Sequence, residues 1–147
     1  MLEDAASRNE VLNGLEDINR YPGLVKDFQE LWGDYGNEGE IPPTLETTKE
    51  FTKYIEQIDK DPSTESRQKR LMAHVYTRHM GDLMGGQMLA KKVPGSSAMY
   101  EFANPDKLKG LIRAKLDDSM ADEVRVAYKF ATSTFKEMLP YANVKEE

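Results

Sequence analysis

The chain of 147 residues contains no cysteine, so it can form neither disulfide bonds nor thiolate metal sites. It also lacks an apolar run long enough for a membrane span or for the hydrophobic region of a signal peptide. Positive charge is in the minority, because 20 basic residues stand against 26 acidic ones and the net charge is −6. An acidic chain without a dense basic block disfavours nucleic acids. These absences predict a cytoplasmic protein that binds neither nucleic acid nor membrane.

What the chain does contain is a series of short segments with helical periodicity. Its length and its 39% of hydrophobic residues suit a single domain, residues 1–147, with one real core. Glycine and proline separate the segments, and a loop is expected at 37–43. The segments with apolar residues at helical spacing are 2–15, 22–35, 47–58, 62–92, 105–116 and 124–139. The pattern predicts an all-α fold, a bundle of about six helices.

Three helix starts are marked by residues that commonly cap helices. Thr47 begins a T-x-x-E pattern, which is typical of a capping box. Asp61 precedes Pro62, and Asn104 precedes Pro105, so that a polar N-cap residue stands before a proline suited to the first turn. These patterns predict helices that begin near residues 47, 62 and 105.

The segment 74–92, HVYTRHMGDLMGGQMLAKK, combines helical periodicity with three glycines. Each interior glycine destabilises a helix by about 1 kcal/mol relative to alanine, so the three together cost roughly 3 kcal/mol. Gly81 and Gly85 lie one turn apart and share a face. Their missing side chains allow either close packing of another helix or the approach of a flat ligand to the backbone. The pair Gly85 and Gly86 could also allow a kink.

Four polar residues have both a binding and a structural interpretation. Asp82 lies about 100° round the helix from Gly81 and borders the same groove, or it is a solvated carboxylate. His74 is a ligand candidate or a core histidine. Lys109 and Arg113 are one turn apart and form either a cationic edge for a carboxylate or a solvated helix face. If the binding interpretations hold, a flat, apolar ligand with acidic edges could fit such a groove.

The same residues resemble the heme oxygenase family. HVYTRHMGDLMGGQML is similar to the family's distal-helix signature, in which H-x-Y-T-R is followed by G-D-L-x-G-G-Q. The matching positions are His74, Tyr76, Thr77, Arg78, Gly81, Asp82, Leu83, Gly85, Gly86 and Gln87. LEDINRYPGLVKDFQELWGDYG, YEFANPDKLKGLIRAKLD and YKFATSTFKEML resemble further segments of the family. The resemblance spans nearly the whole chain and implies a heme-oxygenase-like helical bundle.

The resemblance also implies roles for the matched residues. In the family, the distal-helix glycines place backbone against the heme face, and an aspartate holds a water network that delivers protons to the reacting oxygen. Gly81 and Asp82 are therefore the implied catalytic positions. The implied heme-binding residues are Tyr76, Thr77, Arg78, Gly81, Gly85 and Gly86 on the distal helix, Lys109 and Arg113 at the propionates, and Tyr128 and Phe135 against the porphyrin.

The implied reaction uses heme as both substrate and cofactor. Three oxygenation rounds open the ring to biliverdin and release iron and carbon monoxide, with electrons from a ferredoxin or a reductase. The family's proximal histidine would lie before Met1, so the resemblance implies an N-terminally shortened bundle with no assigned metal ligand. His74 is the fallback candidate for the iron. His79 stands where the family usually has an aromatic residue.

Two other functions stay open at this point. One is a non-catalytic heme- or tetrapyrrole-binding pseudo-enzyme, and the other is a helical module whose groove packs against a partner helix. A bundle without its first helices would leave apolar faces uncovered around Gly81, Gly85, Tyr128 and Phe135. Because such patches usually mark a binding site or an oligomer interface, a two-fold homodimer is expected.

Overall fold

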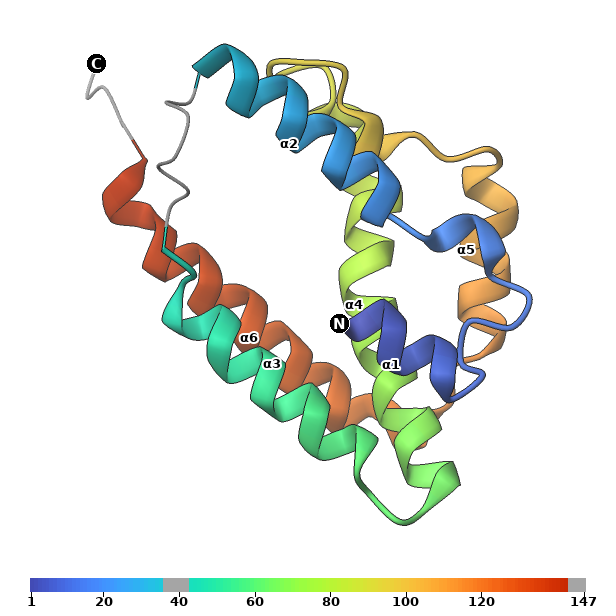
Figure 1. Ribbon diagram of the computed structural model, residues 1–147. Coiled ribbons are helices and arrows are strands. Elements are labelled where there is room, and N and C mark those ends of the chain that lie inside the picture. Colours follow the sequence, from blue (N-terminus) through green and yellow to red (C-terminus); the bar gives the residue numbers. More distant parts are fainter. Residues whose placement is uncertain (36–42, 143–147) are drawn as a thin grey trace.

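The computed structural model describes residues 1–35 and 43–142, which form helices joined by turns (Figure 1). The α-helices are α1 (Leu2–Arg8), α2 (Tyr21–Tyr35), α3 (Glu46–Asp59), α4 (Thr64–Leu89), α5 (Pro105–Ala114) and α6 (Ala121–Met138). Single turns of 3-10 helix are η1 (Glu16–Ile18), η2 (Ala98–Tyr100), η3 (Asp118–Met120) and η4 (Leu139–Tyr141). No strand occurs in these two ranges, and the predicted all-α fold with six helices is confirmed. The loop expected at 37–43 lies almost entirely outside the described residues.

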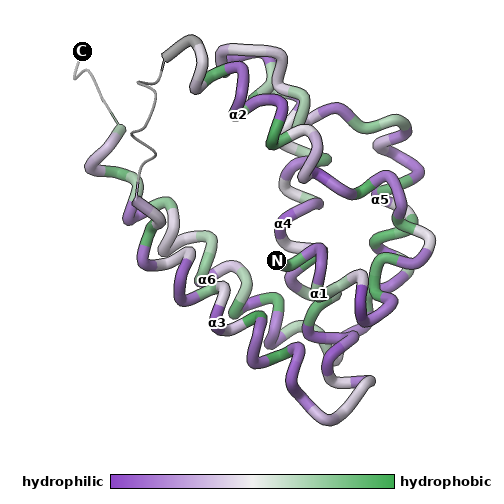
Figure 2. Tube along the Cα trace, viewed as in Figure 1, coloured by the Kyte–Doolittle hydropathy of each residue, from purple (hydrophilic) through white to green (hydrophobic). Residues whose placement is uncertain are grey.

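The long helix α4 is the centre of the molecule, and α1, α3, α5 and α6 all pack against it. Leu71 and Val75 of α4 are completely buried, together with Ile55 and Ile58 of α3 and Ile112 of α5. Figure 2 shows hydrophobic and hydrophilic residues alternating along the helices. Such amphipathic helices bury one side and leave the other to solvent, which accounts for the single core around α4.

Part of α4 is left uncovered by its neighbours. The helices α3 and α6 pack against each other and against α4, and Figure 1 shows both diverging from the C-terminal half of α4. The helix α2 packs on η2 instead. Large apolar side chains are exposed on α2, α4 and α6. They are Tyr21, Leu24 and Phe28 on α2, Met84 and Met88 on α4, and Tyr128 and Phe135 on α6. None of the described helices is long and apolar enough to cross a membrane.

The three helices begin near the predicted residues, but two of the three predicted caps are wrong. The helix α3 begins at Glu46, and the N–H groups of Glu46 and Thr47 donate to the Glu137 carboxylate of α6 at 2.7 and 2.9 Å. A side chain from a distant helix therefore replaces the local capping box. The helix α4 begins at Thr64, because Ser63 and not Asp61 accepts the N–H of the first turn.

Other predicted boundaries agree with the structure, with one exception near the N-terminus. The Asn104 side chain accepts the Lys107 N–H at 3.1 Å and begins α5, as predicted. The segment 2–15 was expected to be one weak helix, but α1 ends at Arg8. Glu10 and Gly14 have φ angles of +62° and +79°, and this left-handed backbone cannot continue a helix.

Candidate functional site

One side of α4 is open to solvent and has two glycines, which leave its backbone uncovered. We call Gly81, Met84, Gly85 and Met88 the glycine face, because their spacing places them on one side of the helix. A Cβ atom added to Gly81 or Gly85 would meet no described atom within 4 Å. Met84 and Met88 are 57% and 70% exposed. No described helix packs on these two glycines, so the helix-packing interpretation fails for them, and a flat ligand could reach the backbone.

Gly86 has a different environment from its two neighbours in the signature. It is buried, and a Cβ atom there would lie 2.4 Å from Cδ1 of the Tyr100 ring. The adjacent Gln87 side chain donates to the Tyr100 carbonyl at 2.8 Å. Gly86 therefore allows η2 to pack closely on α4. The resemblance assigned Gly86 to the heme, but the structure places it on the η2 side, away from the glycine face.

The glycines of α4 provide a direct comparison of stability. Gly81→Ala is expected to stabilise the ligand-free protein by about 0.5–1 kcal/mol, because the new methyl group meets open space and alanine favours the helix. Gly86→Ala is expected to destabilise it by about 1–3 kcal/mol, because the Tyr100 ring must shift. Urea denaturation of both variants measures the difference. Equal changes in the free energy of unfolding for the two substitutions would contradict the conclusion that Gly81 is open and Gly86 is packed against Tyr100.

Asp82 lies beside a pocket of about 440 Å³ formed by α1, α2 and α4. The charged and titratable side chains that line this pocket are Glu3, Tyr21, Arg20, Arg78, His79 and Asp82. Burial raises the pKa of Asp82 above its ordinary value, and the charges of His79, Arg20 and Arg78 oppose this rise. Among the described residues none makes a hydrogen bond to the Asp82 carboxylate. Asp82 is thus half-buried beside a pocket that carries several charged side chains, which argues against an ordinary solvated carboxylate.

His74 lies in the core and not on an open surface. It is completely buried, and its Nε2 donates to Oε1 of Glu123 at 2.8 Å. The rings of Phe51 and Tyr54 lie 5.5 and 5.7 Å from the His74 ring, centroid to centroid. The interpretation as a core histidine is confirmed. The fallback assignment of His74 as an iron ligand is wrong, because α3 and α6 cover the ring.

Glu123 joins His74 to a larger polar network that the sequence analysis did not identify. Its carboxylate also accepts the Tyr54 hydroxyl at 2.8 Å and the Arg70 Nε at 3.1 Å. Burial alone would raise the pKa of Glu123, but the hydrogen bonds from His74 and Tyr54 and the charge of Arg70 outweigh it, so the pKa lies below its ordinary value. A single glutamate in a helix gives no sequence signal for such a contact.

The residues that precede the glycines are held by α3 and by α4 itself. Tyr76 is half-buried and packs against the core. The Thr77 hydroxyl donates to the Ala73 carbonyl at 2.9 Å. The Arg78 guanidinium lies 4.1 Å from the centre of the Phe51 ring of α3, in a cation–π contact. Arg78 also lines the pocket beside Asp82, and Tyr76 and Thr77 do not line it.

The remaining predicted residues are on two helices that the structure does not bring together. Figure 1 shows α5 and α6 on opposite sides of α4. On α5, the Lys109 Nζ lies 3.3 Å from the Asp106 carboxylate and Arg113 is exposed. On α6, Tyr128 and Phe135 are 54% and 72% exposed. No hydrogen bond or ion pair in the described part of the chain links any of the four to α4.

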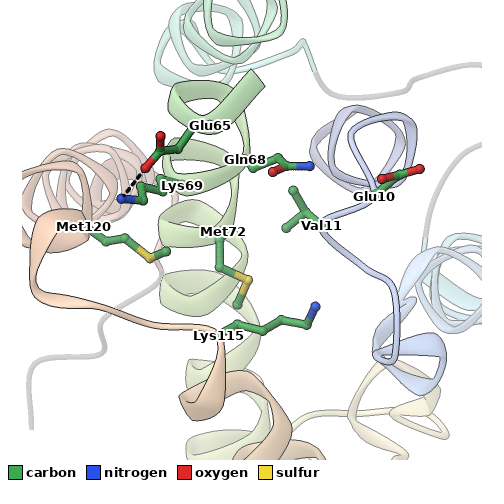
Figure 3. Close-up of a pocket in the computed structure, with 8 residues that line it drawn as sticks. All are labelled: Glu10, Val11, Glu65, Gln68, Lys69, Met72, Lys115 and Met120. Atoms are coloured by element: carbon green, nitrogen blue, oxygen red, sulfur yellow. Dashed lines mark ion pairs between the residues drawn. The ribbon is translucent and has the colours of Figure 1, made fainter. Parts of the chain in front are cut away.

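A second pocket, of about 270 Å³, lies away from the predicted site (Figure 3). Figure 3 shows Met72 and Met120 near its centre, with the Glu65–Lys69 ion pair at its edge. None of the residues predicted from the sequence lines this pocket. The described residues also contain no group of three histidine or acidic side chains that could hold a metal ion. The glycine face and the pocket beside Asp82 thus remain the candidate site.

Comparison with known proteins identifies the family. A model of the heme oxygenase family matches residues 2–137. This chain belongs to the heme oxygenase family. Heme oxygenase 2 of Macaca fascicularis is 29% identical over 83% of this chain, which covers 43% of that protein. Heme oxygenase 1 of Rattus norvegicus is 32% identical over 75% of the chain and 40% of its own length.

The heme oxygenase relatives are longer than this chain. The heme oxygenase of Takifugu rubripes is 26% identical over 88% of the chain and 52% of that protein. The chain thus spans about half or less of the length of these curated relatives. Family membership confirms the resemblance. The roles of individual residues depend on the geometry described above.

Proposed function

We propose that this protein binds heme on the glycine face and supports oxidative opening of the ring to biliverdin. The observation that carries the proposal is the open backbone at Gly81 and Gly85, directly beside the half-buried Asp82. A flat macrocycle can contact a helix backbone closely only where Cβ atoms are missing. Asp82, about 100° round the helix, then lies at the edge of the bound ring.

The described residues fit the apolar plane of a heme but offer no exposed histidine as an axial ligand. The glycine face offers backbone and the exposed thioethers of Met84 and Met88. By the resemblance, Lys109 and Arg113 of α5 are the proposed partners of the propionates, and no hydrogen bond or ion pair in the described part of the chain joins them to the glycine face. His74 and His79 are both buried, with their Nε2 atoms on carboxylates. Bound heme would supply the iron that activates dioxygen and the ring that is oxidised.

The proposed role of Asp82 is to hold and move protons. Its carboxylate has no direct hydrogen-bond partner among the described residues and borders a pocket large enough for several water molecules. Because burial favours the neutral form of the acid, Asp82 can take up and release a proton more readily near neutral pH than an exposed aspartate. Through water it can supply the protons that oxygen activation consumes.

The direct test of this function is turnover of hemin with an external electron donor. Purified protein, hemin and a ferredoxin with its reductase are expected to yield biliverdin, measured by its absorbance, together with carbon monoxide and iron. Saturable hemin binding without any biliverdin would instead support a second candidate, a non-catalytic heme binder. That candidate is favoured by one observation, namely that both histidine side chains are buried.

Lys109 and Arg113 offer a separate test of how the heme edge is bound. Charge-assisted pairs with a carboxylate are stronger than neutral hydrogen bonds, but exposed pairs contribute little. Lys109→Ala combined with Arg113→Ala is expected to weaken hemin binding roughly tenfold to thirtyfold, with the loss diminishing at high salt. Arg125→Ala, which removes an exposed charge from α6, is the control. Equal affinity of the double variant and the control would leave the pair as a solvated face.

We also propose two partners. The first is an electron donor, a ferredoxin or a reductase, because ring opening requires reducing equivalents. The second is another copy of the chain, since exposed apolar side chains on α2, α4 and α6 are typical of a surface that is covered in solution. Sedimentation at micromolar concentration is expected to show a dimer. A compact monomer would rule this partner out.

A further inference from the structure

His79 is the one buried histidine that shares a pocket with Asp82. The two side chains are three residues apart on α4, which places them as neighbours on the helix surface, and both line the pocket of about 440 Å³. The His79 Nε2 lies 2.8 Å from Oε1 of Glu3, and its Nδ1 lies 3.0 Å from the Val75 carbonyl. The ring is only 4% exposed. Its orientation is therefore fixed by two hydrogen bonds.

Both partners of the His79 ring are hydrogen-bond acceptors. A backbone carbonyl has no proton to donate, and Glu3 also accepts the Arg20 backbone N–H at 3.0 Å. Burial would raise the pKa of Glu3, but the hydrogen bonds from His79 and from the Arg20 N–H outweigh it, so that the pKa is lowered and Glu3 stays ionised. Both hydrogen bonds can form at the same time only if both ring nitrogens carry hydrogen, as they do in the cationic form of the ring.

We propose that His79, held by Glu3, is a positioning residue that controls whether Asp82 carries a proton. A positive charge in a shielded pocket favours the ionised carboxylate, and a neutral ring removes that influence. His79 then acts through Asp82 and touches no substrate itself. The inference deepens the proposed heme reaction, in which Asp82 handles protons, but the His79–Asp82 interaction can be measured without heme.

Other charged groups face the same two side chains and must be included in the experiment. They are the Met1 amino group and Glu3 from the α1 region, Arg20 before α2, Tyr21 on α2, Arg78 on α4 and Tyr100 on η2. Arginine stays charged at every pH used, and tyrosine is neutral below about pH 9.

The experiment follows the Asp82 carboxyl carbon by ¹³C NMR in the full-length, heme-free chain as the pH is changed. In the unmodified protein, the Asp82 signal is expected to show a second, smaller step at the pH where the His79 ring signals titrate. His79→Gln keeps an N–H donor for Glu3 but cannot become charged. It is expected to remove that step and to raise the Asp82 midpoint by about one pH unit. Arg125→Gln, which removes one positive charge from α6, is the matched control. It is expected to change neither the second step nor the Asp82 midpoint.

The outcomes separate this proposal from the proposed function. An Asp82 titration that shows no second step in the unmodified protein overturns the proposal, whether or not any variant folds. The same holds if the Asp82 midpoint in His79→Gln equals that of the unmodified protein. If the midpoint rises as expected but the protein makes no biliverdin, the His79–Asp82 interaction stands and the proposed reaction fails. If biliverdin forms, its pH–rate profile is expected to shift upward in His79→Gln by the same interval.

Discussion

Asp82→Asn is expected to leave hemin binding intact and to slow biliverdin formation by about 10²–10⁴-fold. The substitution keeps the size and polarity of a side chain that is half-buried beside the pocket of α1, α2 and α4. It replaces the carboxyl group by an amide, which does not exchange protons in this way. Water in the pocket therefore loses Asp82 as a proton donor and acceptor. The measurement compares initial rates of biliverdin formation under one electron donor, with hemin affinity determined on the same samples.

The control for this prediction is Asp122→Asn. Asp122 lies in the first turn of α6, where its side chain is 94% exposed and pairs with Arg125. It changes the net charge equally but is expected to leave the rate unchanged. A rate in Asp82→Asn equal to that of the control would show that Asp82 has no role in proton delivery. A loss of hemin binding in Asp82→Asn would instead assign Asp82 to binding.

Glu123→Ala is expected to destabilise the fold by about 3 kcal/mol, which is typical when one partner of a buried polar network is removed. The Glu123 carboxylate accepts hydrogen bonds from His74, Tyr54 and Arg70, and it is 14% exposed. Without it, the buried His74 Nε2 loses its partner. Asp122→Ala, on the adjacent exposed position, is expected to change stability little. Urea denaturation at pH 7 measures both.

The same network predicts an acid sensitivity of defined sign. The pKa of Glu123 in the folded protein lies below its ordinary value of 4.5, because the hydrogen bonds and the Arg70 charge outweigh burial. The contribution of this group to stability is therefore fully present above about pH 4.5 and is lost as the pH falls through the folded pKa. Glu123→Ala should show a shallower loss of stability over that range. An identical acid limb in both proteins would contradict the network.

The sequence predicted the helices well because each one has an apolar stripe that the core must bury. It predicted the start of α5 for a similar reason, since Asn104 caps its own helix. It could not predict the start of α3, where Glu137, about 90 residues later, accepts the first N–H groups. Capping by a distant side chain depends on how helices pack, and local patterns do not contain that information.

In the candidate site too, the sequence predicted what depends on one helix and missed what depends on contacts between segments. Helical spacing correctly placed Gly81 and Gly85 on one side of α4, but it could not show that Gly86 packs on Tyr100. Glu3 and Arg20, which line the pocket beside Asp82, come from separate segments and carried no signal. His74 lies on nearly the same side of the helix as Gly81. Only the divergence of α3 and α6 decides that His74 is covered and Gly81 is open.

The most direct test of the central claim is a hemin titration followed by Soret absorbance. The account predicts saturable binding of one hemin per chain, weakened at least tenfold in Gly85→Leu, because the new side chain occupies the space in front of the backbone. Gly33→Leu is the control, since Gly33 on α2 also has no described atom within 4 Å of an added Cβ. Circular dichroism confirms that both variants are folded. Equal hemin affinity of Gly85→Leu and the unmodified protein, or no saturable binding by either, would contradict the claim that the glycine face binds heme.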